Sequence, residues 1–352
     1  MDSVKHKHEK QMLEDPNIEL WSREGFLGTS VALARPHHSA DYLRVEGPHA
    51  PRRLDIGKLL VPDRDDPAAL PLMIASTRSD VKISISARAA VMPYVIRNVE
   101  ADEVHFVQEG EMEFQTDFGF LTASKGDFVI IPRSVAYRVR PLGRSTLVMI
   151  VESPGALRLD TPTPVGMINT EQDVSYPQFD RPAESAGETT LLLKCFDGIT
   201  KFTKSEDPLA LAGIAPGPKP VWRVNLAKIR PMTYFPDGGP PGQFLASPGN
   251  DLLFYTLSAR PTGRPPIHHN ADYDELVQFH AGPGSWGAID TPGMIALVPK
   301  GVTHHGPSEN VPEGYLAWLL ESRGTLRFTE TALSVAEFVE TGYYDRHPTA
   351  NN

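Results

Sequence analysis

Apolar residues in this chain recur in short runs and not in long helical patterns. From Lys82 onward the runs are rich in β-branched and aromatic residues, as in VKISISARAAVMPYVIRN, DEVHFVQEGEMEFQT, FGFLTASKGDFVIIP and STLVMIVES. Such residues favour strands, and the Gly, Pro, Asn and Ser residues between the runs favour turns. The pattern therefore predicts a complete β-sandwich or barrel over residues 82–160.

A second series of strand-like runs follows a less regular stretch. Residues 161–220 are rich in proline and aspartate and carry one clear strand pattern, ETTLLLKCF, so we expect a connecting segment that wraps over the folded parts. The second series comprises VWRVNLAKI, NDLLFYTLSA, DELVQFHAG, GSWGAID, GMIALVP and GYLAWLLES. It predicts another barrel over residues 221–330.

Residues 1–81 and 331–352 lie outside these two series. The first segment begins with charged residues and lacks apolar periodicity, so we expect an N-terminal arm with loops, packed from about Trp21 and Phe26 onward. The second contains SVAEFVETGYY, in which Ser334 is a suitable N-cap and three apolar residues share one helical face: Val335, Phe338 and Val339. A short C-terminal helix and a tail are therefore predicted.

The two strand series are copies of one another. Three segments align in the same order: residues 96–110 on 268–282, 126–137 on 293–304, and 152–159 on 321–328. Within the first pair, Asn98 matches Asn270, and Glu103 matches Glu275. A shared order of three segments indicates that one barrel was duplicated.

The copies differ where chemistry is expected. Three imidazoles of the second copy have no counterpart in the first, where Ile96, Arg97 and Tyr137 stand at the positions of His268, His269 and His304. The first copy keeps the carboxylate of Glu103 but not the imidazoles, so it is predicted to bind no transition metal. Its one histidine, His105, is expected to be a strand residue with a hydrogen bond of its own.

Composition and charge narrow the class of protein. A length of 352 residues allows two domains, and 33 prolines with 28 glycines suit a turn-rich β protein. The net charge of -10 argues against nucleic acid or an anionic membrane as the main partner. No apolar run approaches the ~18 residues of a membrane span, and no signal peptide opens the chain, so we expect a cytoplasmic protein. The single cysteine, Cys195, excludes an internal disulfide framework.

Metal-ligand residues gather in the second copy, in PPIHHNADYDELVQFHAG and GMIALVPKGVTHHG. A strand that carries His268 and Asn270 points both side chains to one face, because strand side chains alternate. Glu275 arrives from the following strand, and His304 from a hairpin that returns across the barrel. Two His and one carboxylate leave coordination positions open, which is the pattern of non-haem Fe(II) oxygenases. The predicted metal ligands are His268, Asn270, Glu275 and His304, with Asn270 as a weak ligand or a hydrogen-bonding group.

Neighbouring histidines leave alternatives open. The spacing from Pro299 and Gly301 selects His304, whereas His305 is the runner-up and is otherwise expected to orient a ligand or handle a proton near the metal. His269 is expected outside the barrel or against a neighbouring element. His280 lies five residues after Glu275, on the opposite strand face, so it is not expected to be a ligand.

These two motifs resemble those of the cupin superfamily, G-x5-H-x-H-x3,4-E-x6-G and G-x5-P-x-G-x2-H-x3-N. The resemblance implies an all-β bicupin, that is, two duplicated double-stranded β-helix (jelly-roll) barrels with short helices. Three departures are present: Asn270 replaces the second histidine, Gly263 lies one residue too close to His268, and Ser308 replaces the final asparagine.

Within the cupins, HHNADYDE followed by THHGPSEN is similar to the homogentisate 1,2-dioxygenase family, and alignment on its HGP segment favours His305 as ligand. No histidine lies between His105 and His268, where that family has a proton handler, and the chain is shorter than its members. The large subunit of two-component hydroquinone 1,2-dioxygenases is the better match. The resemblance implies cleavage of a para-diol ring by O2 at Fe(II), with homogentisate or gentisate as alternative substrates.

The resemblance also implies partners and a substrate pocket. We expect a small aromatic substrate, O2, and either a smaller cupin-like subunit or a homo-oligomer. Candidate pocket walls are the aromatic residues Trp222, Tyr273, Trp286 and Trp318, each of which competes with a core-packing role. The alternative of another class is a non-oxygenase cupin, either a binding module or a metal-dependent isomerase or decarboxylase.

Overall fold

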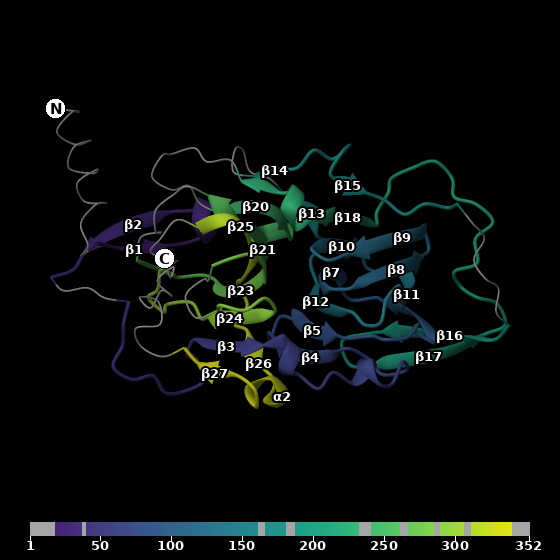
Figure 1. The fold of residues 1–352 in the computed structure, drawn as a ribbon, viewed down its shortest axis with the longest axis horizontal. Helices are drawn as coiled ribbons and strands as arrows, with labels where there is room; N and C mark the ends of the chain where they lie inside the picture. The colour runs from purple at the N-terminus through teal and green to yellow at the C-terminus, as the bar shows by residue number, and fades with distance from the viewer. Residues whose placement is uncertain are drawn as a thin grey trace.

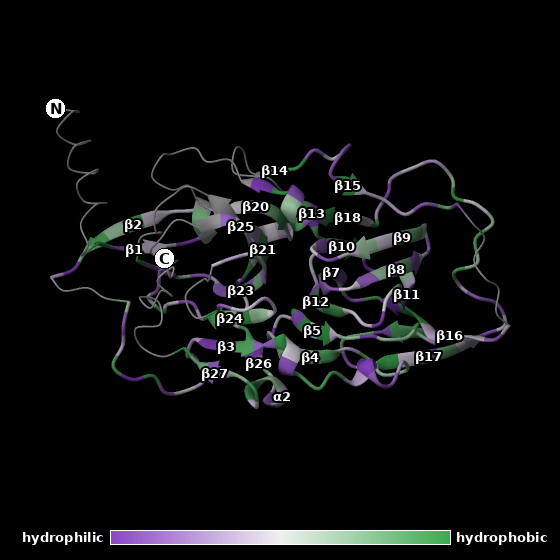
Figure 2. Cartoon of the chain, viewed as in Figure 1, coloured by the Kyte–Doolittle hydropathy of each residue, from purple (hydrophilic) through white to green (hydrophobic). Residues whose placement is uncertain are grey.

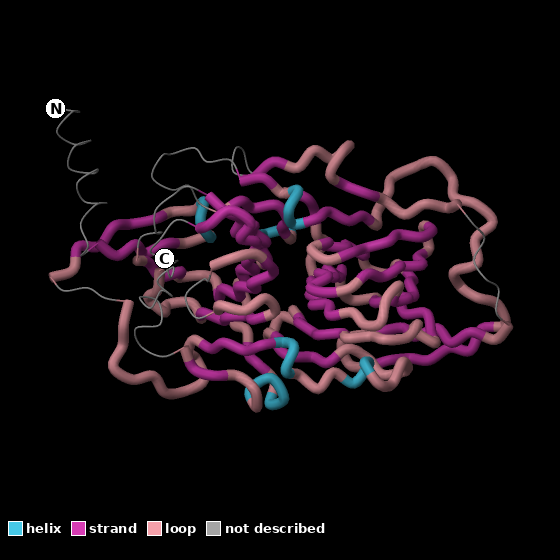
Figure 3. The backbone as a smooth tube through the Cα atoms, viewed as in Figure 1, coloured by secondary structure: helices cyan, strands magenta, loops and turns pink. Residues whose placement is uncertain are grey.

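The computed structural model describes residues 18–36, 40–160, 166–180, 187–231, 241–260, 267–284, 289–305 and 311–339. Short antiparallel strands form nearly all of its regular structure, as the prevalence of magenta in Figure 3 shows. Apolar and polar residues alternate along the strands (Figure 2), because one face of each barrel strand points to the barrel interior. In the described part of the chain, no helix is long and apolar enough to cross a membrane.

The first barrel combines an eight-stranded and a six-stranded sheet. The eight-stranded sheet has the order β15 (Val174–Ser175), β18 (Trp222–Asn225), β10 (Asp127–Ile131), β7 (Asp102–Glu109), β12 (Leu147–Ser153), β5 (Lys82–Ser86), β4 (Leu72–Ser76) and β26 (Arg327–Phe328). The six-stranded sheet has the order β17 (Ile199–Lys204), β16 (Thr189–Lys194), β6 (Tyr94–Asn98), β11 (Ala136–Pro141), β8 (Glu111–Thr116) and β9 (Gly119–Ser124).

The second barrel lies beside the first along the long axis of the molecule (Figure 1). Its eight-stranded sheet has the order β13 (Arg158–Leu159), β20 (Gly242–Ala246), β21 (Leu252–Arg260), β25 (Val311–Ser322), β23 (Asp274–Ala281), β24 (Met294–Val298), β3 (Arg52–Asp55) and β27 (Glu337–Phe338). A three-stranded sheet, β2 (Ser30–Ala34), β1 (Ile18–Ser22) and β22 (His268–Asn270), completes it, and β14 (Gly166–Met167) pairs with β19 (Arg230–Pro231).

The internal repeat is visible in matching hydrogen bonds. Asp102 accepts backbone N–H groups from Arg133 and Leu157 at 2.8 Å each. Its counterpart Asp274 accepts those of Lys300 and Leu326 at 2.9 and 2.7 Å. A buried carboxylate that joins two loops is costly to lose, since the N–H groups would remain unpaired. The fold is thus an all-β bicupin, two copies of one barrel, as the sequence predicts.

The barrels exchange strands, so their boundaries differ from the predicted ones. β18 was expected to open the second barrel, but it pairs with β10 of the first. β3, from the predicted N-terminal arm, pairs with β24 of the second barrel, and β26 pairs with β4 of the first. Sequence patterns identify strands but not their partners, because pairing depends on the tertiary arrangement.

Two hairpins are exchanged in the same reciprocal manner. The hairpin β1–β2 precedes the first barrel but pairs in parallel with β22 of the second, where Ser22 lies opposite Asn270. The hairpin β16–β17 precedes the second barrel but pairs in parallel with β6 of the first, where Lys194 lies opposite Asn98. Figure 1 shows the two hairpins at opposite ends of the molecule.

An aromatic core joins the barrels. The Trp318 ring lies 5.2 Å from that of Phe106 and 5.4 Å from that of Phe128, both from the first barrel. Phe128 also meets Phe244 of the second barrel at 5.1 Å. These residues belong to one buried cluster that runs through both barrels, so the halves share a core.

The predicted C-terminal helix is wrong for the residues that the structure describes. The only α-helix there, α2 (Glu330–Leu333), is capped by Thr329, whose Oγ1 accepts the N–H of Ala332 at 3.3 Å, and Ser334 ends the helix. Phe338 belongs to β27, which pairs with β3. Strand pairing there provides a partner that an isolated amphipathic pattern cannot reveal. The remaining residues, 340–352, lie outside the described ones.

Candidate metal centre

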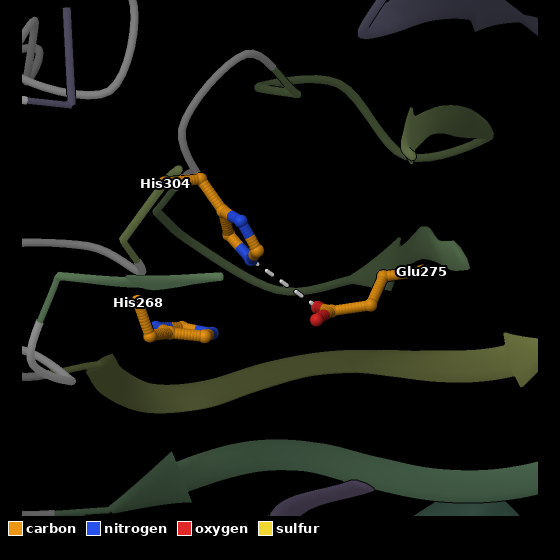
Figure 4. A group of neighbouring side chains, drawn as sticks. All are labelled: His268, Glu275 and His304. Carbon is orange, nitrogen blue, oxygen red and sulfur yellow. Dashed lines mark ion pairs between the residues drawn. The ribbon is translucent and has the colours of Figure 1, made fainter. Parts of the chain in front are cut away.

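Three of the predicted ligands gather in the second barrel. The potential ligand atoms of His268, Glu275 and His304 all lie within 4.8 Å of one another. His304 Nε2 is 3.4 Å from Glu275 Oε2, and the two imidazole centroids are 4.3 Å apart. Figure 4 shows both rings directed toward the carboxylate. His305 is also buried, but the group is formed with His304, as the cupin spacing predicts and the HGP alignment does not.

Backbone pairing sets this arrangement. His268 and His304 form an antiparallel bridge, with N–H to carbonyl distances of 2.8 and 2.9 Å. The neighbouring His269 points to the other face of β22, where its Nδ1 lies 2.5 Å from Glu19 Oε1 of β1. Strand alternation thus directs His268 inward and His269 toward the N-terminal hairpin.

The His304 ring is fixed by a hydrogen bond on its far nitrogen. Nδ1 lies 2.9 Å from the carbonyl oxygen of Val302, which can only accept, so Nδ1 carries the proton and donates. This bond turns Nε2 toward Glu275, as in metal-bound histidines whose second nitrogen is held by a backbone carbonyl.

Charge is concentrated at this site. Burial would raise the pKa of Glu275, but the imidazoles of His304 and His268 and the Asn270 amide lower it overall. Burial would lower the pKa of His304, but Glu275 and the Val302 carbonyl raise it. In the described part of the chain, Glu275 Oε1 accepts no hydrogen bond. A buried carboxylate oxygen beside two imidazoles fits a bound cation.

Asn270 is oriented away from a ligand role. Its Oδ1 accepts the backbone N–H groups of Asp272 and Tyr273 at 3.1 and 3.2 Å, which identifies the oxygen because a backbone N–H only donates. The NH2 group therefore faces the carboxylates and donates to Glu321 Oε1 at 2.9 Å. An amide NH2 cannot coordinate a metal. Asn270 is therefore not placed as the weak ligand that was one of the two predicted alternatives. It holds the turn through its oxygen and positions the carboxylates through its NH2 group.

Glu321 and Tyr255 complete the site and were missed from the sequence. Glu321 accepts the Tyr255 hydroxyl at 2.9 Å, and both side chains are fully buried. Burial and the nearby Glu275 raise the pKa of Glu321 well above its usual range. A signal was present, because the repeat aligns Glu321 with Glu152.

The first barrel contains the same arrangement of one asparagine and two glutamates, together with the ammonium group of a lysine. Asn98 donates to Glu103 and Glu152 at 2.9 and 3.0 Å, and Lys194 Nζ lies 2.6 Å from Glu152 Oε1. Among the described residues of the second barrel, no lysine or arginine pairs with the equivalent carboxylates, because Ser22 occupies the register position of Lys194. A divalent cation would supply there the charge that Lys194 supplies in the first barrel.

The other ligand positions of the first barrel are occupied by hydrogen bonds. Tyr137, at the position of His304, donates its hydroxyl to Glu103 Oε2 at 2.6 Å. His105 Nε2 lies 2.9 Å from the same oxygen, so its hydrogen bond is to a neighbour on its own strand, as predicted. The cavity beside His105 and Tyr137 has a volume of only about 30 Å³, room for little more than a water molecule.

The predicted pocket walls lie elsewhere. Trp222 is buried in the sheet of the first barrel, and Trp318 is buried in the core between the barrels. Tyr273 belongs to the turn after Asn270, where its hydroxyl donates to the Asn250 carbonyl at 2.6 Å. Trp286 lies outside the described residues. Trp222 and Trp318 therefore have core-packing roles, and Tyr273 packs in a turn.

Comparison with known proteins gives distant likenesses. No family model matches the chain. A protein described as "Putative dioxygenase SSO1533" from Saccharolobus solfataricus is 24% identical in an alignment of 241 residues that covers 65% of this chain. The chain spans 61% of the length of that relative.

Three solved structures have a weak overall likeness to this chain. A cupin 2 conserved barrel domain protein from Leptotrichia buccalis is 13% identical, with a TM-score of 0.36 over 75% of this chain and 98% of that one. A variant of oxalate decarboxylase from B. subtilis is 10% identical, with a TM-score of 0.42 over 82% and 80%. Salicylate 1,2-dioxygenase from Pseudaminobacter salicylatoxidans is 12% identical, with a TM-score of 0.45 over 84% and 89%. The bicupin assignment rests on the strand order and the internal repeat of this chain.

Proposed function

We propose that this chain is an Fe(II)-dependent ring-cleaving dioxygenase that inserts O2 into a para-diol aromatic compound such as hydroquinone. The observation that carries the proposal is the group formed by His268, Glu275 and His304, with ligand atoms within 4.8 Å of one another. Two imidazoles and one carboxylate would leave coordination positions open for two reactants. The distant dioxygenase relative supports the same class of reaction.

Each side chain of the site would have a distinct role in such a centre. Bound by these three side chains, Fe(II) would supply Lewis-acid and redox chemistry to a phenol and O2. One carboxylate and two neutral imidazoles leave a divalent ion with net positive charge, which favours a phenolate oxygen as ligand. The Val302 carbonyl holds the His304 ring, and Asn270 and Tyr255 hold the second carboxylate, Glu321, beside Glu275. A pre-positioned site of this kind aligns the reactants without further ordering.

The experiment that tests this function is oxygen uptake by protein loaded anaerobically with Fe(II). We expect O2 consumption with hydroquinone, and ring-opened product in equal amount by mass spectrometry. Homogentisate and gentisate test the related substrates, and oxalate with CO2 detection tests a decarboxylase. Bound iron without O2 consumption on any of the three para-diols would overturn the dioxygenase proposal.

We also propose that the active form contains further subunits, either a smaller cupin-like chain or copies of this chain. The proposal comes from the resemblance to two-component hydroquinone dioxygenases. Light scattering of the purified protein and activity with a co-expressed small cupin-like subunit test it. A monomer that is fully active alone would contradict it.

A further inference from the structure

The loop of the N-terminal hairpin reaches the candidate metal centre. β1 runs parallel to β22 with Ser22 opposite Asn270, so the chain after Ser22 continues beside the turn that follows Asn270. The Phe26 ring lies edge-on to the His268 imidazole, with centroids 6.2 Å apart, and edge-on to Tyr255 at 5.3 Å. An aromatic side chain from the start of the chain thus adjoins a predicted metal ligand.

Backbone geometry holds this loop close to the site. Gly25 has a φ of +73°, and a Cβ built on it would lie 2.5 Å from Glu321 Oε2 and 2.7 Å from the Tyr255 hydroxyl. Glu24 also has a positive φ, 61°, which is uncommon for a residue other than glycine. Strained backbone of this kind persists only where surrounding contacts enforce it.

An ion pair supplies such contacts. Arg23 donates from Nε and Nη2 to the two carboxylate oxygens of Asp272, each at 3.1 Å, and the Glu24 N–H donates to Asp272 at 3.0 Å. The Ala271 N–H donates to the Ser22 carbonyl at 2.9 Å. The loop is therefore joined to the turn that follows Asn270, and bidentate pairing fixes its direction.

The equivalent hairpin of the first barrel has no such loop. β16 and β17 are joined by only four residues, 195–198, whereas seven residues, 23–29, join β1 and β2. In the hairpin β16–β17, the last residue of β16 is Lys194, and its ammonium group lies beside the Glu152 carboxylate of the first barrel. The inserted loop and the metal-ligand residues thus occur together in the same half of the molecule.

The loop adjoins the least buried of the three candidate ligands. Glu275 and His304 are 2% and 1% exposed, whereas His268 is only partly buried, and so is Phe26. The Phe26 ring therefore lies beside the least buried of the three candidate ligands, whose Nε2 is itself buried. Aromatic rings favour edge-to-face or offset contacts with another ring.

We propose that Phe26, held by the Arg23–Asp272 pair, is a specificity-determining residue of this site that favours planar aromatic ligands over small dicarboxylates. The inference rests on the proposed function, because it assumes a metal at His268, Glu275 and His304. It extends that function by assigning ligand selection to an element outside the metal-binding motifs.

Binding of two probes tests the inference without turnover. 4-Nitrocatechol, followed by its absorbance shift, and oxalate, as its competitor, are titrated anaerobically into the Fe(II)-loaded protein. For Phe26→Ala we expect about 3- to 10-fold weaker binding of 4-nitrocatechol, unchanged oxalate binding and unchanged iron content. Phe26→Leu keeps the apolar volume but loses the ring, so it should show the same selective loss even if the alanine variant folds poorly.

The control is Phe202→Ala, on the hairpin that docks to the other barrel, where the residue is 43% exposed. Its affinities should equal those of the wild type. Equal 4-nitrocatechol affinity in Phe26→Leu and wild type, or equal weakening of both probes, would overturn the inference. Failure of the proposed function is distinguishable, since wild-type protein would then bind the probe but consume no O2 with para-diols.

Discussion

At the scale of single residues, the two halves of the molecule provide a comparison within one chain. Both contain an asparagine that closes a turn with its oxygen and turns its NH2 group to a pair of buried glutamates. In the first half Lys194 balances the charge, and in the second half two imidazoles face the carboxylate. The asparagine and the two glutamates are common to both halves and belong to the duplicated fold, whereas the two imidazoles are specific to the candidate metal centre.

The ligand assignment predicts a difference between two histidine variants. His268→Ala removes one of three ligands and should abolish binding of iron, measured by plasma emission spectroscopy after anaerobic loading. His105→Ala removes a buried imidazole from the first barrel and should leave the iron content unchanged. Iron retained by His268→Ala, or lost from His105→Ala, would refute the assignment. Because bound metal stabilises only the folded state, iron should also raise the melting temperature of the wild type but not that of His268→Ala.

Asn270 and Asn98 give a second matched pair. Each alanine variant leaves two backbone N–H groups without their acceptor and removes an amide donor from the buried glutamates, so the free energy of unfolding should fall by about 1–3 kcal/mol in both. Only Asn270→Ala should also weaken iron binding, by about 10-fold, since it releases Glu321 beside the ligand Glu275. Urea unfolding and iron titration measure the two effects. Unchanged iron affinity in Asn270→Ala would show that Asn270 does not position the ligand carboxylate.

At the scale of elements, strands β7 and β23 meet in a buried polar contact between the barrels. His280 Nδ1 donates to Gln108 Oε1 at 3.1 Å, and the Gln108 amide donates to the His280 carbonyl at 3.1 Å. Phe106 lies edge-on to the imidazole at 5.0 Å. As expected from strand alternation, His280 points away from the ligand carboxylate.

This contact predicts a pH dependence of stability. Burial, with a contribution from Lys125, lowers the pKa of His280 to about 4. The unfolded chain therefore binds a proton between pH ~6.5 and ~4 that the folded protein does not, so the free energy of unfolding falls as pH decreases through this window. The loss reaches about 3 kcal/mol for a shift of this size.

The pH dependence is measured by urea unfolding at a series of pH values. His280→Gln should reduce the slope of stability against pH by up to one proton in this window. An unchanged slope in His280→Gln would contradict the predicted role of this imidazole.

At the scale of the whole molecule, the barrels are joined by exchanged strands and a common core. β3 and β13 complete the second barrel from sequence positions before it, and β18 and β26 complete the first from positions after it. Phe106, Phe128 and Trp318 bury their rings against one another across the junction. Neither half therefore has all of its strands within one continuous stretch of chain.

This exchange predicts that the second barrel does not fold alone. A fragment of residues 205–352 lacks β1, β3 and β13 and should show no cooperative thermal transition by circular dichroism. Co-expression with residues 1–204 should restore one. A sharp transition in the isolated fragment would show that the exchanged strands are dispensable.

The sequence by itself determined the central strands of the two barrels, the duplication and the three residues that gather at the candidate centre, but not the strands β1–β4 of the predicted N-terminal arm. These depend on local chemistry, namely period-two alternation, turn residues, and the spacing of His268, Glu275 and His304 along short connected strands. The C-terminal helix was wrong because a strand partner, β3, outweighed a helical pattern.

Only the tertiary structure decided which strands pair across the barrels, which way the Asn270 amide faces, and that Glu321, Tyr255 and Phe26 adjoin the ligands. These features join residues that are far apart along the chain. Such contacts depend on how complete sheets pack, and no local spacing encodes that.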